Sequence, residues 1–312
     1  MYNLRYHIAS LASVFIALAL GLVLGGLIVD DSTGSSNQAI VESLQADFAA
    51  VREQSAETQK LNDLLNSFVS ESVPASIHNQ LEGYAVIVIR DETKTADVAS
   101  QILAQAGASV IPVSINTAKL AEASKERATA AAKEAAEKGH EGPLEFDVFA
   151  DYAKALAQEW TDHTLIERPI MDELIQDGIL EMPVIDWPTT QVLGIVDAVA
   201  PPETAERTPS IALLQEVATL GFPGILVSTD TMEDFDITKL DNVTNISAVD
   251  ELDSAIGSYS LVALLKGAEP GLYGTMRNAV STFALMPHEL KYAGKPIPEP
   301  VPEAEPTPEV TQ

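Results

Sequence analysis

The sequence predicts a mixed α/β protein in which a membrane helix and a helical stalk precede a Rossmann-like domain built on a mostly parallel sheet. Three observations support this prediction: a charge-free apolar run near the N-terminus, an interrupted heptad pattern after it, and short apolar runs that alternate with helical stretches. Strands that are apolar throughout, separated by helices, are typical of a parallel sheet covered on both faces.

The first element is the apolar run at residues 8–29, which contains no charged side chain. A helix of this length, rising about 1.5 Å per residue, crosses roughly 30 Å of hydrocarbon, and the run exceeds the about 7 to 15 apolar residues of a signal peptide. Arg5 precedes the run and Asp30 follows it, so the positive-inside rule places residues 1–7 in the cytoplasm. We expect a single-pass protein of the cytoplasmic membrane with most of its chain outside the cytoplasm.

The second element is a stalk at residues 30–75, which begins with a Ser/Gly-rich juncture and which we expect to end at Pro74. Its apolar residues follow an a/d-like register at Val41, Leu44, Phe48, Val51, Leu65 and Val69. Ser55, Thr58 and Asn62 interrupt this register, so a coiled coil here needs a partner helix or a second copy to complete it. A stalk helix that rests on its own domain is the equal alternative.

The third element is an α/β domain at residues 82–290. Apolar runs beginning near Tyr84, Ala108, Val192, Gly224 and Asn242 predict strands, with helices at 94–106, 210–220 and 250–265. Between the second and third runs, about residues 117–180 form an Ala/Lys/Glu-rich insertion predicted to be helical, with Gly139 stopping its first helix. Residues 291–312 are rich in proline and acids, which predicts a disordered tail.

Composition and motifs argue against several functions. The net charge of −28 disfavours nucleic acid, and the absence of cysteine removes thiolate metal sites. The turn after the first strand reads RDETK, without the glycines that admit a nucleotide phosphate. No nucleophile elbow or HExxH motif occurs, so we name no catalytic residue, expect no enzyme and see no evident cofactor.

One short cluster contains ligands that soft copper(I) accepts, namely thioether and imidazole. It consists of Met286 and His288, with Met276 ten residues upstream. The competing interpretation, which the pattern favours, is a domain end in which Met286 packs and His288 is solvated.

Both ends of the chain carry a family resemblance. Its residues are Leu4, Arg5, His7, Ser10, Leu11, Val14, Phe15, Ala17 and Leu18 at the start, and Gly271, Tyr273, Gly274, Ala279, Leu285 and Pro287 near the end. This pattern resembles the actinobacterial MctB family, described as copper transporter or copper-homeostasis membrane proteins. Within it, Arg5, Gly271, Tyr273 and Gly274 are family-motif positions; the last three mark either a family-specific surface or a structural corner that needs positive φ.

The resemblance implies copper homeostasis at the envelope, with copper as a possible ligand by resemblance only. A single apolar helix offers no polar path for an ion, so we expect the protein to act through protein contacts, by Val41, Leu44, Phe48, Val51 and Leu65. The alternative implied by the resemblance is a scaffold like SteB, which pairs with SteA, or docks a hydrolase helix, to regulate peptidoglycan hydrolysis and cell separation. An uncharacterised envelope enzyme is the third hypothesis.

Overall fold

A computed structural model of the chain describes residues 4–26, 34–137, 148–199, 209–232, 246–276, 279–292, 294 and 297. The chain divides into two compact units, Met1–Phe68 and Val69–Gln312. The first unit is helical, and the second contains the sheet.

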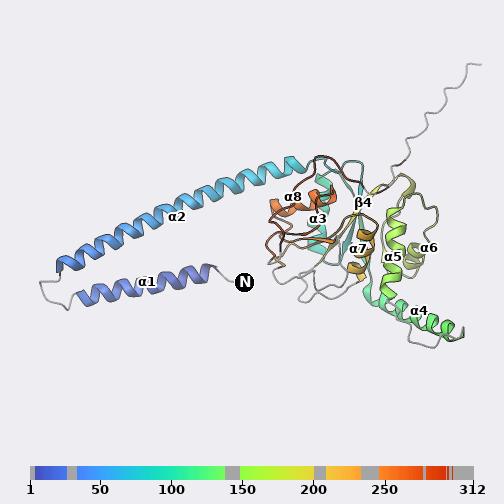
Figure 1. The fold of residues 1–312 in the computed structure, drawn as a ribbon, viewed down its shortest axis with the longest axis horizontal. Coiled ribbons are helices and arrows are strands. Elements are labelled where there is room, and N and C mark those ends of the chain that lie inside the picture. The colour runs from blue at the N-terminus through green and yellow to red at the C-terminus, as the bar shows by residue number, and fades with distance from the viewer. Residues whose placement is uncertain are drawn as a thin grey trace, which may run out of the picture. The chain divides into compact units, whose positions relative to one another are not determined.

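Two helices make up the first unit: α1 spans Leu4–Gly26, and α2 begins at Gly34 and continues to Ile77 in the second unit (Figure 1). The large apolar side chains described in both helices up to Phe68 are predominantly exposed. Among the residues that the structure describes, no helix is both long enough and apolar enough to cross a membrane. The predicted span at residues 8–29 extends beyond α1 into residues 27–29, which lie outside the described part of the chain.

The prediction that the stalk helix ends at Pro74 is wrong, because α2 contains Pro74 and ends three residues later at Ile77. An internal proline costs a helix about 3 kcal/mol. Ile77 and the following Leu81 are fully buried in the domain core, and burying one such side chain contributes about 1.5 to 3 kcal/mol. The tertiary packing of these two residues therefore offsets the cost of the proline.

The second unit is built on a seven-stranded sheet in the order β3-β2-β1-β4-β5-β6-β7. Its strands are β1 (Ala85–Arg90), β2 (Ser109–Ile115), β3 (Leu180–Glu181), β4 (Val192–Ala198), β5 (Gly224–Val227), β6 (Ile246–Val249) and β7 (Leu272–Tyr273). All neighbouring strands pair in parallel except β3, which runs antiparallel to β2. The first six strands follow the order of a dinucleotide-binding fold.

Helices cover both faces of this sheet (Figure 1). The helices are α3 (Thr93–Gln105), α4 (Thr117–Glu137), α5 (Val148–Thr161), α6 (Pro169–Gln176), α7 (Pro209–Thr219) and α8 (Ala255–Leu265), with a short 3-10 turn at Trp187–Thr189. One core lies between the sheet and α3 and α8, the other between the sheet and α5 and α7. The prediction of a mixed α/β domain with a mostly parallel sheet is confirmed.

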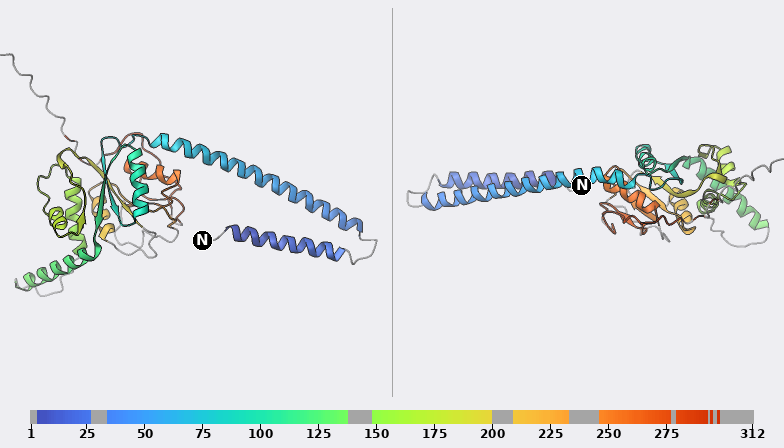
Figure 2. Two further views of the ribbon diagram at one scale, coloured as in Figure 1. Left: turned by 180° about the vertical axis from the view of Figure 1, so that it is seen from behind. Right: turned by 90° about the horizontal axis from the view of Figure 1, so that it is seen from above.

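Helices α4, α5 and α6 follow one another between β2 and β3, and α4 extends away from the sheet (Figure 2, green). The Glu159 carboxylate at the end of α5 accepts hydrogen bonds from the first-turn amides of Ile170 and Met171 in α6. The Arg168 guanidinium, which stacks on Trp187 at 4.6 Å, donates to the carbonyl of Glu159. These contacts fix the α5–α6 connection on the domain.

Some predicted boundaries fall elsewhere or outside the described residues. The two-residue strands β3 and β7 were not predicted, and Gly139 and Asn242 lie outside the described part of the chain. In the segment predicted as a tail, the Tyr292 ring packs against that of Tyr84 with ring centroids 5.3 Å apart, and the Lys291 amide donates to the Lys266 carbonyl. The described contacts of the domain therefore reach Tyr292.

Candidate functional site

At the carboxyl edge of the sheet, the direction in which the chain winds reverses between β1 and β4. The chain leaves β1 toward β2 on one side and leaves β4 toward β5 on the other. Helix α3, after β1, covers one face, and α7, after β4, covers the opposite face. In open parallel sheets ligands bind at this kind of switch point, so its polar side chains are the first candidates for a site.

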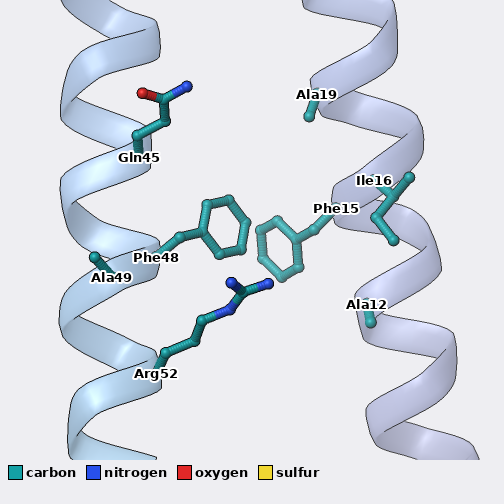
Figure 3. A pocket seen from close by; sticks show the side chains of 8 residues that line it. All are labelled: Ala12, Phe15, Ile16, Ala19, Gln45, Phe48, Ala49 and Arg52. Carbon is teal, nitrogen blue, oxygen red and sulfur yellow. The ribbon is translucent and has the colours of Figure 1, made fainter.

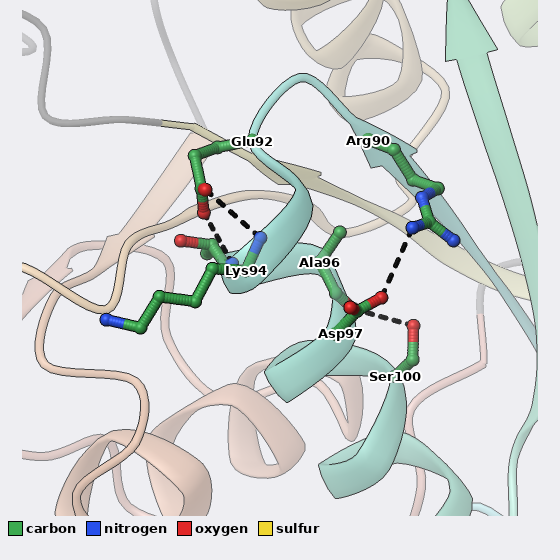
Figure 4. A network of polar contacts seen from close by, with 7 residues as sticks. Arg90, Glu92, Lys94, Ala96, Asp97 and Ser100 are labelled. Atoms are coloured by element: carbon green, nitrogen blue, oxygen red, sulfur yellow. Dashed lines mark hydrogen bonds and ion pairs between the residues drawn. The ribbon is translucent and has the colours of Figure 1, made fainter.

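On the α3 side, a carboxylate of the chain itself occupies the amino end of the helix, where an external anion would otherwise bind. The Glu92 carboxylate accepts hydrogen bonds from the backbone amides of Lys94 and Thr95 at the amino end of α3 (Figure 4). The bonds from Thr95 hold the pKa of Glu92 below its ordinary value. In nucleotide-binding folds the phosphate takes these amides. Here the carboxylate of the chain itself occupies them, so this turn is not arranged for a phosphate.

Next to this cap, Arg90 and Asp97 form an ion pair at 3.2 Å (Figure 4). Both side chains are exposed to solvent, and such pairs contribute about 0 to 1 kcal/mol. The pair therefore fixes the orientation of two surface side chains and gives little stability.

On the α7 side, two carboxyl groups and a hydroxyl converge. Asp197 on β4 pairs in register with Ile89 on β1, and Asp91 follows Ile89 by two residues. Because side chains alternate between faces, all three lie on the face that α7 covers. The Ser210 hydroxyl, in the first turn of α7, donates to the Asp91 carboxylate at 3.2 Å. Asp91 is exposed at the rim, whereas Asp197 is completely buried.

This environment opposes ionisation of both acids. Burial, and secondly the charge of Asp91, raises the pKa of Asp197 well above its ordinary value, although the Ser210 hydroxyl lowers it somewhat. Partial desolvation raises the pKa of Asp91, again against the effect of Ser210. Within the described residues, neither carboxyl oxygen of Asp197 has a partner in full hydrogen-bond geometry, so the nearby Ser210 hydroxyl offsets the effect of burial only in part. The arrangement can hold either a proton or a cation.

The apolar run that predicts β4 also contains an indication of this cluster. An aspartate stands inside the apolar run VLGIVDA, where every residue is buried. An acid in such a strand has no solvated position, so it marks a buried site. Its neighbour Asp91 belongs to RDETK, a polar turn in which an acid is not unusual, so this turn alone gives no indication of a buried site.

The predicted partner-binding residues of the stalk lie on α2. Val41 is half-buried, whereas Leu44, Phe48, Val51 and Leu65 are between 37% and 63% exposed. Phe48 meets Phe15 of α1 edge to face, with ring centroids 6.4 Å apart and Arg52 beside them (Figure 3). Both rings stay about half exposed, so this contact leaves the apolar face of α2 uncovered.

Met286 and His288 have different surroundings, and Met276 lies on the other face of the sheet from Met286. Met286 packs against the core on the α3 and α8 face, and His288 is exposed, while Met276 is buried in the core on the α5 and α7 face. Within the described part of the chain, no group of three or more His, Cys, Asp or Glu side chains is arranged to hold a metal. Copper binding by Met286 and His288 stays a prediction.

The family-motif residues near the C-terminus pack the end of the sheet; the side chain of Arg5 lies outside the described residues. Gly274 has a φ of +123°, and a Cβ there would lie 1.7 Å from a carboxylate oxygen of Asp250. That carboxylate accepts from the amide and hydroxyl of Thr275 at 2.9 and 2.8 Å. Tyr273 is buried, and at Gly271 a Cβ would lie 3.2 Å from a Val280 methyl group. The geometry favours the structural corner over an exposed surface.

Comparisons with known proteins agree on one family. A family described as "Copper transport outer membrane protein, MctB" matches residues 1–283 of this chain. The chain is similar to the copper transporter MctB of Mycobacterium bovis and to that of Mycobacterium tuberculosis strain H37Rv, at 30% identity over 126 residues in each case. These alignments cover 39% of this chain and 40% of each relative, so they span less than half of the relatives' length.

Proposed function

Because this chain belongs to the MctB family of copper transport proteins, we propose that it serves copper homeostasis at the cell envelope. In this proposal α1 anchors the protein in the cytoplasmic membrane and α2 docks another protein or a second copy of the chain. The sheet domain is then held outside the cytoplasm. Copper handling depends on the assembly that α2 makes.

Two features support the anchor. The sequence from residue 8 to residue 29 is apolar and uncharged, and α1 is helical from Leu4 to Gly26. The large apolar side chains described in α1 are between 44% and 63% exposed, and an apolar surface of this extent suits a helix surrounded by lipid. Arg5 before the run supports a cytoplasmic N-terminus.

The exposed apolar face of α2 is the observation that supports protein contacts most directly. Leu44, Phe48 and Val51 recur at coiled-coil spacing and remain exposed. A contiguous apolar surface that a protein leaves open marks an interaction site. The polar residues in the middle of the seam favour a partner helix that supplies matching polar groups.

The same features argue against a pore made by this chain alone. The apolar run contains no charged side chain, so it provides no polar path for an ion. The relatives are named copper transporters, and this name supports copper homeostasis ahead of a role in peptidoglycan hydrolysis.

The proposal is tested in a strain that lacks the gene. Full-length protein and the double variant Phe48→Gln/Val51→Gln are expressed at equal levels, and growth is measured across a copper series. We expect the wild-type chain to restore copper tolerance and the double variant to fail. The matched control is Ala46→Gln/Ala50→Gln, which places the same side chains on the opposite, exposed face of α2 and should restore tolerance.

Photo-crosslinking in intact cells tests the contact itself. A photoreactive residue at position 44 should give a defined cross-linked product, of twice the chain's mass for a second copy or another fixed mass for a partner, whereas position 46 should not. Alkaline carbonate extraction should leave the protein in the membrane fraction. Extraction into the soluble fraction, or equal function of both double variants, would contradict the proposal.

A copper(I) titration of the purified full-length protein against a competing chelator tests direct binding. Met286→Leu/His288→Ala serves as the comparison. Submicromolar binding that the double variant loses would make copper a direct ligand of this chain. Absent binding would place copper handling in the partner, whereas binding that the double variant retains would place the copper ligands elsewhere on this chain.

A further inference from the structure

The carboxyl groups at the switch point have no part in the function proposed above. Asp197 is fully buried on β4, its oxygens have no hydrogen-bond partner among the described residues, and Asp91 and Ser210 lie beside it. Burying an uncompensated carboxyl group costs free energy that a fold keeps only for a reason. The donor atoms of these three side chains therefore indicate which kind of ligand could complete the group.

We propose that Asp91, Asp197 and Ser210 form a binding site for a hard divalent cation of the Mg²⁺, Mn²⁺ or Ca²⁺ class. The potential ligands are four carboxylate oxygens and one hydroxyl oxygen. Oxygen-only ligand sets suit these ions, and Mg²⁺ in particular is held by one or two carboxylates with water filling the other positions. Soft copper(I) prefers sulfur and imidazole, so this site is distinct from the copper chemistry of the family.

The position of the three groups fits an ion that arrives from solvent. Asp91 is exposed at the rim and Asp197 lies beneath it on the neighbouring strand. Ser210 closes the group from α7 through its hydrogen bond to Asp91. The site thus lies at the carboxyl edge between β1 and β4, where open parallel sheets bind their ligands.

A proton shared by the two acids is the competing explanation. A protonated Asp197 would carry an O–H that needs an acceptor, and the described residues place none in full hydrogen-bond geometry at its oxygens, although the Ser210 hydroxyl lies near enough to lower its pKa somewhat. A buried polar hydrogen without an acceptor costs free energy. A cation removes this cost and the repulsion between the two acids at once, because both then ionise as its ligands.

The test uses full-length protein in detergent, freed of metals with a chelator and held at neutral pH. Titration with MnCl₂ is followed by the electron paramagnetic resonance signal of free Mn²⁺. We expect one bound ion per chain, with the affinity reduced at least about tenfold in Asp197→Asn and in Asp91→Asn, since even outer-shell substitutions cost that much. Asp97→Asn removes an exposed carboxylate nearby and should bind Mn²⁺ as the wild type does.

Thermal unfolding with and without MgCl₂, MnCl₂ or CaCl₂ provides the second readout. At least one of the ions should raise the unfolding midpoint of the wild-type protein and of Asp97→Asn, and none should raise that of Asp197→Asn. If Asp197→Asn does not fold, Ser210→Ala takes its place, and weaker Mn²⁺ binding is expected. Wild-type protein that binds none of the three ions, or variants that bind them equally well, would overturn the proposal.

Discussion

The stalk exposes most of its large apolar side chains, whereas the sheet domain buries most of its own. In the domain, residues such as Leu214 and Ile195 are completely buried between the sheet and its helices, whereas Leu64 and Phe68 on α2 are both 67% exposed. A domain that packs its own core needs no partner to fold. A helix that exposes this much apolar surface to solvent is typical of an interaction site. Among the described residues the domain buries most of its large apolar side chains, whereas α2 leaves most of its own exposed, and an interaction through this exposed surface is what we propose for the stalk.

The largest effect on the free energy of unfolding is expected from a substitution in the core of the sheet domain. Leu214→Ala leaves a cavity in the core beneath α7 and should lower the free energy of unfolding by about 2 to 5 kcal/mol. Both tryptophans, Trp160 and Trp187, are buried in the domain, so their fluorescence during denaturant unfolding reports on this unit. A loss below about 1 kcal/mol would mean that α7 is not packed as described.

A backbone substitution at the family motif should come next. Gly274→Ala forces a Cβ against the Asp250 carboxylate at a positive φ, and should cost at least about 1 to 3 kcal/mol. Gly83→Ala is the matched control, because its φ is +85° but a Cβ there meets nothing within 4 Å. We expect a smaller loss at Gly83, measured by the same unfolding curves. Equal losses would show that backbone strain alone, and not the contact with Asp250, determines the cost.

The third effect concerns Asp197, a buried carboxyl group of the domain whose oxygens have no partner in full hydrogen-bond geometry among the described residues. The folded-state pKa of Asp197 lies above its unfolded value, so in chelator-treated protein its contribution to stability is fully present below the unfolded pKa and is lost as pH rises through the folded one. We expect the stability of the wild type, relative to Asp197→Asn, to fall as pH rises above about 4. Unfolding curves between acid and mildly alkaline pH measure this. A difference that is constant with pH would contradict the raised pKa.

The smallest effect should come from the stalk. Leu64→Ala removes a large exposed side chain, and the stability of the domain should change by less than about 0.5 kcal/mol. The same tryptophan signal checks this prediction. A loss similar to that of Leu214→Ala would show that the stalk helix rests on its own domain, the alternative that the sequence left open.

The sequence predicted those parts of the fold that local pattern controls. The runs beginning near Tyr84, Ala108 and Val192 became β1, β2 and β4, because a strand buried on both faces must be apolar throughout. Helices α3, α7 and α8 were predicted within a few residues of their ends, except that α8 begins five residues after the predicted start. The predicted stalk residues do lie on one helix, α2.

What the sequence did not show depends on tertiary contacts. Strands β3 and β7 have two residues each, too few for any periodicity, and exist because a neighbouring strand offers an edge. The helix passes Pro74 because Ile77 is buried beyond it. The pairing of Asp91 with Asp197 joins residues more than a hundred positions apart, and only the register of β1 against β4 brings them to one face.

The cap that Glu92 forms on α3 has an evolutionary consequence. The fold presents the winding of a nucleotide-binding domain, yet its own carboxylate stands where a phosphate would bind. Gaining a nucleotide would require this lineage first to lose that side chain and then to acquire glycines in a turn that has none. A phosphate site at the turn after β1 is therefore several substitutions away from the present sequence.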